Sequence, residues 1–221
     1  MFYSERFLKL LLRSPLVVGV DGTFRSIPRI FGVNGQLFIM HLFLQQGEGE
    51  ERMLCLPAVW ALLSNKSVHS YELVLTKMRE AMHLLNIQNR QVRDWQDLNF
   101  SFPGGIKLDF EGSLIRAFRN ASPQTQLSGC MFHFIQAVFR KAVDLGWRGE
   151  YFQPSYGLFP FQKFLRCLFA LCFVKPVDVY GTFNALIDYP PVNAMITHYH
   201  EHGKSLQPLI AYFRRQWLGG T

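Results

Sequence analysis

The first third of the chain alternates apolar runs with turn signals, a pattern typical of β-strands. One apolar run spans residues 16–24, a second begins at Gly35 with "GQLFIMHLFLQ", and a third begins at Arg52 with "RMLCLPAV". The turn signals Asn34-Gly35 and "QGEGEE" separate these runs. Three consecutive strands predict a β-meander.

The hydrophobic period then changes to that of a helix. Apolar residues three and four positions apart form one stripe: Val68, Tyr71, Leu75, Met78, Met82 and Leu85. The spacing predicts an amphipathic helix over residues 66–85 that packs on a sheet.

Two further strand–helix pairs follow. "GGIKLDF" predicts a short strand that ends at Asp109, and "EGSLIRAFRNA" predicts a helix after it. "TQLSGCMF" predicts another strand, and a second apolar stripe then predicts a helix through Met131, Ile135, Val138, Ala142 and Leu145. The expected order is βββαβαβα.

From Gly149 onward the pattern is helical only. Helices are expected over residues 161–173, 176–187, 190–202 and 205–217, with breaks at Pro176 and Pro190-Pro191. The composition change near Gly149 therefore predicts an α/β core over residues 1–148 and an all-helical region over residues 149–221.

The composition indicates a packed globular protein, because 49% of the 221 residues are hydrophobic and 21 are phenylalanine. The formal net charge of +7 would attract nucleic acid or an anionic membrane surface. Part of this excess of positive charge lies in residues 113–148. The basic residues there are candidates for DNA contact: Arg116, Arg119, Arg140, Lys141 and Arg148. A solvated helix face is the alternative interpretation.

The cysteines and the apolar runs indicate in which cellular environment the protein is expected. The four cysteines lack the spacing of a disulfide framework, which favours a reducing, intracellular environment. The longest uncharged stretch, residues 30–47, contains polar residues and glycines and so predicts paired strands and no membrane helix. The N-terminus carries an acid and lacks a cleavage site, which disfavours a signal peptide.

Two aspartates end apolar strands: Asp21 the first and Asp109 a later one. If these strands are neighbours in one sheet, the two carboxylates meet at its edge, where hard oxygen ligands suit Mg²⁺. Two such ions can drive phosphoryl transfer. The alternatives are a hairpin turn at Asp21-Gly22 and a helix cap at Asp109.

The histidine and cysteine motifs are weaker evidence for a functional site than the two aspartates. Cys130-Met-Phe-His133 would place a thiol and an imidazole on one helix face, but zinc needs four ligands, so a structural or DNA-facing role is favoured. "HYHEH", at 198–202, lacks the register of a zinc-protease helix and is interpreted as surface histidines. A zinc protein that combines Cys130, His133 and these late histidines remains a third hypothesis.

Taken together and in order, four motifs resemble the transposase domain of Mutator-like DNA transposable elements (MULE transposases). They are "VDGTF", "LPAVWALLSNKSVHSYELVLTKM", "IKLDFEGSLIRAF" and "GCMFHFIQAVFRKAVDLGW". The helical tail, with "LRCLFALCFVKPVDV" and "YFRRQWLGG", is similar to the helical insertion that such transposases carry. The resemblance covers the chain from Leu16 onward.

The resemblance implies an RNase H-like fold, a mixed five-stranded sheet flanked by helices, with a helical C-terminal insertion. It implies that Asp21 and Asp109 are the first two acids of a D-D-E triad that binds Mg²⁺ or Mn²⁺, and that Cys130 and His133 are a C-x-x-H signature. The implied activity is cleavage and strand transfer of DNA in the nucleus, with transposon ends and target DNA as partners and a homo-oligomer as a compatible assembly.

The chain departs from the family at the third acid. The family's glutamate follows the helical insertion, and Glu111, Glu150 and Glu201 do not occupy that place. The expectation is therefore a fragment or degenerate copy with little or no activity. The alternative is a transposon-derived module that binds DNA or protein without catalysis.

Overall fold

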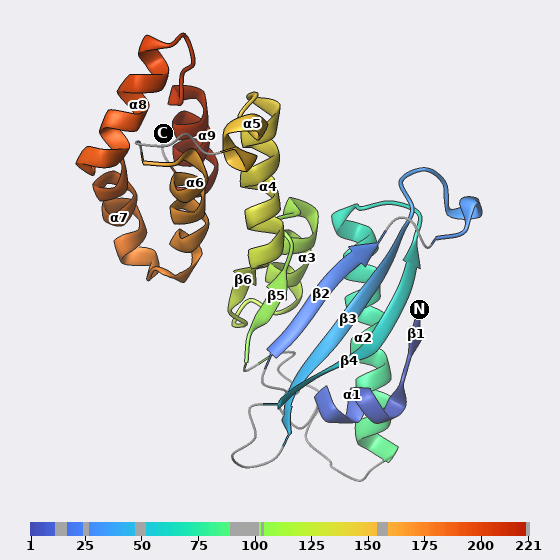
Figure 1. The fold of residues 1–221 in the computed structure, drawn as a ribbon. Helices are drawn as coiled ribbons and strands as arrows, with labels where there is room; N and C mark the ends of the chain where they lie inside the picture. The colour runs from blue at the N-terminus through green and yellow to red at the C-terminus, as the bar shows by residue number, and fades with distance from the viewer. Residues whose placement is uncertain are drawn as a thin grey trace. The chain divides into compact units, whose positions relative to one another are not determined.

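The computed structural model describes residues 1–11, 17–23, 27–46, 52–88, 102, 104–153 and 159–219. The chain forms two compact units, Met1–Cys130 and Met131–Thr221. Each unit has its own cluster of buried apolar residues. The described part of the first unit is α/β, and that of the second is helical (Figure 1).

The first unit is built on one mixed sheet (Figure 1). Its strands are β1 (Phe2–Tyr3), β2 (Val17–Thr23), β3 (Gln36–Gln46), β4 (Arg52–Leu63), β5 (Ile106–Leu108) and β6 (Leu127–Gly129). They lie in the order β1-β4-β3-β2-β5-β6. The pairs from β1 through β2 are antiparallel, whereas β5 is parallel to β2 and β6 is parallel to β5.

The predicted order βββαβαβα is confirmed for the elements that the sequence analysis named. The sheet has six described strands where five were expected, because β1 pairs with β4 at its edge. Two residues are too few to show the alternation by which a strand is predicted. Residues 16 and 24, at the ends of the first predicted strand, lie outside the described residues.

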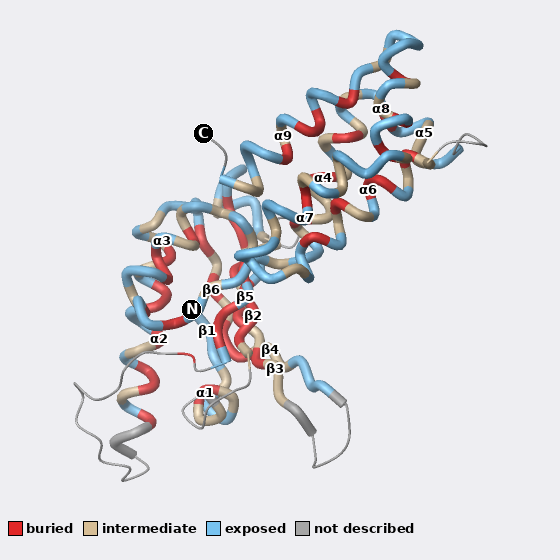
Figure 2. The backbone as a smooth tube through the Cα atoms, turned by 90° about the vertical axis from the view of Figure 1, so that its left-hand side faces the viewer, coloured by how far each residue is buried: buried red, intermediate tan, exposed pale blue. Residues whose placement is uncertain are grey.

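Three helices pack on one face of this sheet: α1 (Glu5–Leu11), α2 (Val68–Gln88) and α3 (Gly112–Ala121). In Figure 2 the buried positions follow one side of α2 and α3. The predicted stripe on α2 is confirmed, since all of its members are buried except Val68, which is half-buried. A short 3-10 helix, η1 (Arg29–Phe31), precedes β3.

Side chains alternate between the two faces of the sheet along the central strands, and this alternation determines which residues face the helices. Val18 and Val20 of β2 are buried in the same cluster as Ile106 and Leu108 of β5. Because successive side chains of a strand point to opposite faces, the residues between and after them point away from this core. Asp21 is one of these residues.

The second unit contains only helices among its described residues. They are α4 (Met131–Asp144), α5 (Arg148–Phe152), α6 (Phe161–Ala170), η3 (Leu171–Phe173), α7 (Pro176–Asp188), α8 (Pro190–Glu201) and α9 (Gln207–Trp217). Proline begins both α7 and α8, where its missing N–H costs nothing. No helix in the described ranges is both long enough and apolar enough to span a membrane.

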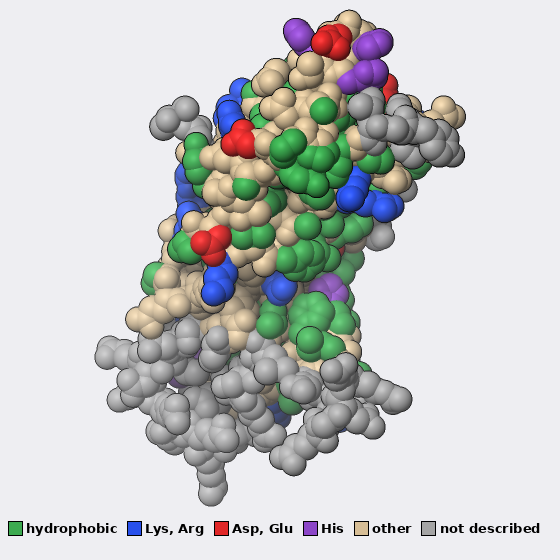
Figure 3. All heavy atoms as spheres, turned by 60° about the vertical axis from the view of Figure 1, so that its left-hand side comes forward, with side chains coloured by type: hydrophobic (Ala, Val, Ile, Leu, Met, Phe, Trp, Pro, Cys, Tyr) green, Lys and Arg blue, Asp and Glu red, His purple; other side chains and the backbone are tan. Residues whose placement is uncertain are grey.

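Aromatic rings form the core of the second unit. Phe183 and Phe213 stack with their centroids 5.2 Å apart, and Trp147 stacks on Phe161 at 4.7 Å. Hydrophobic side chains also reach the surface of this unit (Figure 3), and Phe173 is 77% exposed.

Helix α4 belongs to the second unit. Its Phe134, Val138 and Ala142 are buried with the later helices. The predicted stripe was wrong at Met131, which is 47% exposed, because Phe134 takes the buried position in the first turn. The composition change expected near Gly149 thus lies inside this unit, which begins at Met131.

Candidate functional site

The parallel pairing of β2 with β5 aligns the two predicted acids. Val18 is paired with Ile106, and Gly19 with Lys107. The same register, continued two residues, places Asp21 opposite Asp109. Adjacent strands lie about 4.8 Å apart, so the two backbones are close enough for their carboxylates to share one bound ion.

Both acids lie on the sheet face away from the helices. Asp21 alternates with the buried Val20, and Asp109 alternates with the buried Leu108. Asp21 is exposed and Asp109 is half-buried. A cation could therefore reach the pair from solvent.

Asp21-Gly22 is not a hairpin turn, so that alternative is wrong. Both residues lie inside β2 and pair with Ile39 and Phe38 of β3. The Asp21 Oδ1 accepts a hydrogen bond of 2.8 Å from the Gly22 N–H. A Cβ at Gly22 would lie 2.6 Å from the Gln36 Oε1, so glycine leaves room for the Gln36 side chain beside the strand.

Asp109 does interact with the entrance of the next helix. Its Oδ1 accepts a hydrogen bond of 3.1 Å from the backbone N–H of Glu111, the N-cap residue of α3. This contact fixes one oxygen of the Asp109 carboxylate. The N-cap residue itself makes no side-chain cap bond, so Asp109 braces the turn before α3 and does not cap the helix; its second oxygen is not used by this contact.

A polar network lies next to Asp109. The Tyr71 hydroxyl donates a 2.7 Å hydrogen bond to Glu111 Oε1, and Lys66 Nζ lies 3.3 Å from Glu111 Oε2. The buried Gln36 donates its Nε2 N–H to the Tyr71 hydroxyl. The network holds together β3, the start of α2 and the chain segment that carries Asp109.

Burial and the bond to Glu111 raise the pKa of Tyr71 well above its usual range. Burial is the largest cause, because a phenolate would lose its hydration in this site; the hydrogen bond to Glu111 adds to the shift, because only the neutral hydroxyl can donate it. Tyr71 therefore remains a hydrogen-bond donor throughout the neutral range.

His41 is the titratable neighbour of Asp21 on the next strand. It pairs with Gly19, which precedes Asp21 by two residues on the same face. Burial lowers the pKa of His41, and the negative charge of Asp21 opposes this shift. A neutral imidazole thus borders the acid pair.

Cys130 continues the row of residues at this edge. The β5–β6 register pairs Leu108 with Gly129, so its continuation places Cys130 beside Asp109. The Cys130 N–H donates to the Leu108 carbonyl oxygen at 2.8 Å. His133 belongs to the second unit, and its Nδ1 is buried without a hydrogen-bond partner among the described residues.

The described residues do not gather a third acid at Asp21 and Asp109. Glu111 is bound to Tyr71 and Lys66, whereas Glu150 pairs with Lys204 in the second unit. Over the described ranges, no group of three or more His, Cys, Asp or Glu side chains is placed to hold a metal ion. The continued β2–β5 register thus brings two carboxylates together at this place.

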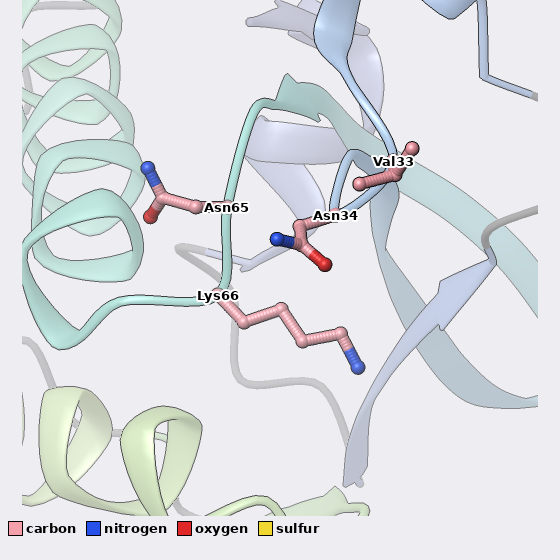
Figure 4. Close-up of a pocket in the computed structure, with 4 residues that line it drawn as sticks. All are labelled: Val33, Asn34, Asn65 and Lys66. Carbon is pink, nitrogen blue, oxygen red and sulfur yellow. The ribbon is translucent and has the colours of Figure 1, made fainter.

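A pocket of about 510 Å³ lies where β3 begins and β4 ends, lined by Val33, Asn34, Asn65 and Lys66. In Figure 4 the Asn34 amide lies between the other two polar side chains, and the Asn65 amide turns toward α2. Asn65 Oδ1 accepts hydrogen bonds from the Ser67 N–H and the Ser70 hydroxyl. Asn65 thus organises the start of the helix that carries Tyr71.

The five predicted DNA contacts divide between the two units. Arg116 and Arg119 are exposed on α3, three residues apart and therefore on one helix face. Arg140, Lys141 and Arg148 belong to the second unit. Lys141 lies over the Tyr212 ring at 5.7 Å, whereas Arg140 and Arg148 are exposed.

Sequence reasoning missed His41, Tyr71 and Lys66. Tyr71 was assigned to packing as part of a predicted apolar stripe, and His41, within a predicted strand, was given no role. An alternation count along β3 could have placed His41 on the face away from the helices. No local signal pairs Tyr71 with Glu111, because their contact depends on how α2 packs.

The hydrogen bond of Tyr71 generates a stability prediction. Tyr71→Phe removes the donor to the Glu111 carboxylate and is expected to lower the free energy of unfolding by about 1.5–3 kcal/mol. Urea unfolding measures this loss. Tyr180→Phe, at a position 58% exposed, is the matched control and should change little. Equal stability of the two variants would contradict the network.

His41 generates a prediction of pH dependence. Its folded-state pKa lies below the ordinary value of 6.5, so the unfolded chain takes up the proton first as the pH falls. The stabilising contribution is complete above pH 6.5 and is lost as the pH falls through the folded pKa. His41→Gln should therefore flatten the decline in unfolding free energy below pH 6.5, as measured by urea unfolding at several pH values.

The control for this experiment is His69→Gln, which changes an exposed histidine of α2. It should keep the pH dependence of the parent chain. A decline that is the same in the His41→Gln variant and the parent would show that another group causes it.

Comparison with known proteins does not identify a family for this chain. The chain matches no protein-family model and no curated protein at a significant level. The family resemblance therefore rests on the quoted motifs, and the fold that carries them is an α/β unit with a mixed sheet, followed by a helical unit.

Proposed function

We propose that the chain is a Mutator-like transposase domain whose first unit is an RNase H-like core. The observation that carries the proposal is the continued β2–β5 register, which aligns Asp21 with Asp109 on neighbouring parallel strands. Acids that are distant in sequence but aligned on adjacent strands suit the metal-dependent chemistry of phosphate esters. DNA is the proposed substrate and the nucleus is the proposed place of action.

The arrangement of the sheet supports the proposal. Strands β4, β3, β2, β5 and β6 form five neighbouring strands of mixed direction. An antiparallel meander, a helix, and then two parallel strands joined by α3 follow in chain order. This agrees with the mixed five-stranded sheet flanked by helices that the family resemblance implies.

Asp21 and Asp109 are the residues that would hold Mg²⁺ or Mn²⁺. Their carboxylate oxygens are the hard ligands that these ions prefer, and Asp21 is exposed to solvent. A bound ion supplies activation of water or a 3′-hydroxyl and stabilisation of the leaving oxygen. The hydrogen bond from the Glu111 N–H orients the Asp109 carboxylate toward that role.

The proposed activity is weak or absent. A second ion would need a further acid, and the described residues bring no third one to the pair. Glu111 lies nearest in sequence, but its carboxylate already accepts from Tyr71 and pairs with Lys66. These contacts hold the Glu111 carboxylate in the polar network.

A non-catalytic DNA-binding module is the second candidate. The observation that favours it is the pair of exposed arginines, Arg116 and Arg119, on one face of α3, together with the net charge of +7. Arginines on a common face can contact successive phosphates of a duplex without a metal ion. The first candidate function requires Mg²⁺ or Mn²⁺, whereas the second requires no metal ion.

Metal binding tests the first candidate. Titration of the chain with Mn²⁺, followed by electron paramagnetic resonance, should show weak binding that Asp21→Asn and Asp109→Asn each reduce by about tenfold or more. Asp188→Asn, which changes an exposed carboxylate of α7, is the control and should bind as the parent does. Binding that survives both substitutions would place the ion elsewhere.

A nuclease assay with Mg²⁺ or Mn²⁺ completes that test. Little or no cutting of DNA is expected. Robust cutting that Asp21→Ala abolishes would show that another residue supplies the missing ligand, and the proposal of weak activity would then be wrong.

Salt dependence tests the second candidate. DNA affinity measured by fluorescence anisotropy should fall steeply with salt and should not require Mg²⁺. Arg116→Ala combined with Arg119→Ala should reduce the magnitude of the log–log salt slope by about 1.8. Lys77→Ala, at an exposed lysine that pairs with Glu80, should leave the slope unchanged. Affinity that is insensitive to salt would exclude phosphate contact by these arginines.

A further inference from the structure

Histidines gather at the C-terminal end of α8 in the second unit (Figure 3). His198 and His200 belong to the last turn of this helix, and His202 is its C-cap residue. Residues four apart lie on the same face of a helix. His198 and His202 therefore share a face, whereas His200 points elsewhere.

The rings of His198 and His202 are in contact. Their centroids lie 4.2 Å apart, and their planes are inclined by 37°. Two imidazole nitrogens bound to one ion at 2.0–2.1 Å in tetrahedral geometry lie about 3.3 Å apart. Rotation of the His198 side chain, without movement of the helix, would let one of its ring nitrogens share an ion with the neighbouring His202 ring.

A backbone contact fixes the proton on one of these rings. His202 Nδ1 lies 2.7 Å from the carbonyl oxygen of His198. A carbonyl oxygen can only accept, so Nδ1 carries the hydrogen, and in the neutral ring Nε2 carries the lone pair. Metal-binding histidines are commonly oriented in this way, with one ring N–H donated to a carbonyl while the other nitrogen binds the ion.

The local charges favour a cation at this end of α8. The carbonyl groups at a helix C-terminus carry partial negative charge. Glu201, which is exposed, adds a full negative charge in the same turn. The nearby cation Lys204 points its charge elsewhere, because its ammonium group pairs with Glu150 and donates to the Gly146 carbonyl oxygen.

We propose that His198 and His202 form a binding site for a borderline divalent cation such as Cu²⁺, Ni²⁺ or Zn²⁺. His202 contributes Nε2, His198 contributes a ring nitrogen, and water completes the coordination. Imidazole suits these ions, whereas Mg²⁺ prefers oxygen. The site is independent of the proposed transposase function, since it uses neither Asp21 nor Asp109.

The pair supplies two protein ligands. No set of three or more ligand side chains surrounds it among the described residues. The expected order of affinity follows the general trend for nitrogen ligands, in which Cu²⁺ binds more tightly than Ni²⁺ or Zn²⁺.

Titration calorimetry of the full chain with Ni²⁺ tests the proposal, with excess Mg²⁺ present to compete at the acid pair. His198→Ala and His202→Ala are each expected to weaken Ni²⁺ binding by about tenfold or more. His200→Ala is the matched control, from the same turn but another face, and should bind as the parent does. Because His200 and His202 are exposed, their variants should fold normally.

The exposed cysteines need a separate control, because thiolates also bind these ions. Cys55 and Cys172 are both exposed. Cys55→Ser combined with Cys172→Ser should keep the Ni²⁺ affinity of the parent. The proposal is overturned if this variant loses binding, or if His198→Ala and His202→Ala bind as tightly as His200→Ala.

Discussion

The parallel register between β2 and β5 is the constraint on which the candidate site depends. Val18, Val20, Ile106 and Leu108 must all face the same buried cluster, so a slip of either strand by one residue would expose them. The register that buries these four residues is also the one that aligns Asp21 with Asp109. Core packing thus determines the position of the acids, even though neither acid contributes to the core.

A network of polar side chains lies next to the acids. Gln36, Tyr71, Glu111 and Lys66 connect β3, α2 and the segment after β5 through hydrogen bonds and an ion pair. Gln36 and Tyr71 are buried, and buried polar groups are costly unless each has a partner; here the partners come from distant parts of the chain. The network holds the side chain of Glu111, the residue whose backbone N–H donates to Asp109.

Much of this architecture could be predicted from the sequence, because the signals are local and periodic. The α2 stripe, the meander of β2, β3 and β4, and the four late helices follow from spacing and from proline positions. Features that depend on packing between distant segments could not be predicted. The stripe on α4 was wrong at Met131, since Phe134 takes the buried place, and His41 could be placed beside Asp21 only once the β2–β3 register was known. The acids themselves were identified because each comes directly after a run of apolar residues, although Asp21 does not end its strand as expected: β2 continues to Thr23.

The most direct measurement of the central claim is a crystal structure of the chain grown with Mn²⁺, with the ion located by its anomalous scattering. The account predicts a peak at the carboxyl ends of β2 and β5, within coordination distance of both Asp21 and Asp109. It would be contradicted by an ion bound elsewhere while the two carboxylates point to opposite faces of the sheet, or by a register in which β2 and β5 no longer hold the two aspartates at the same level.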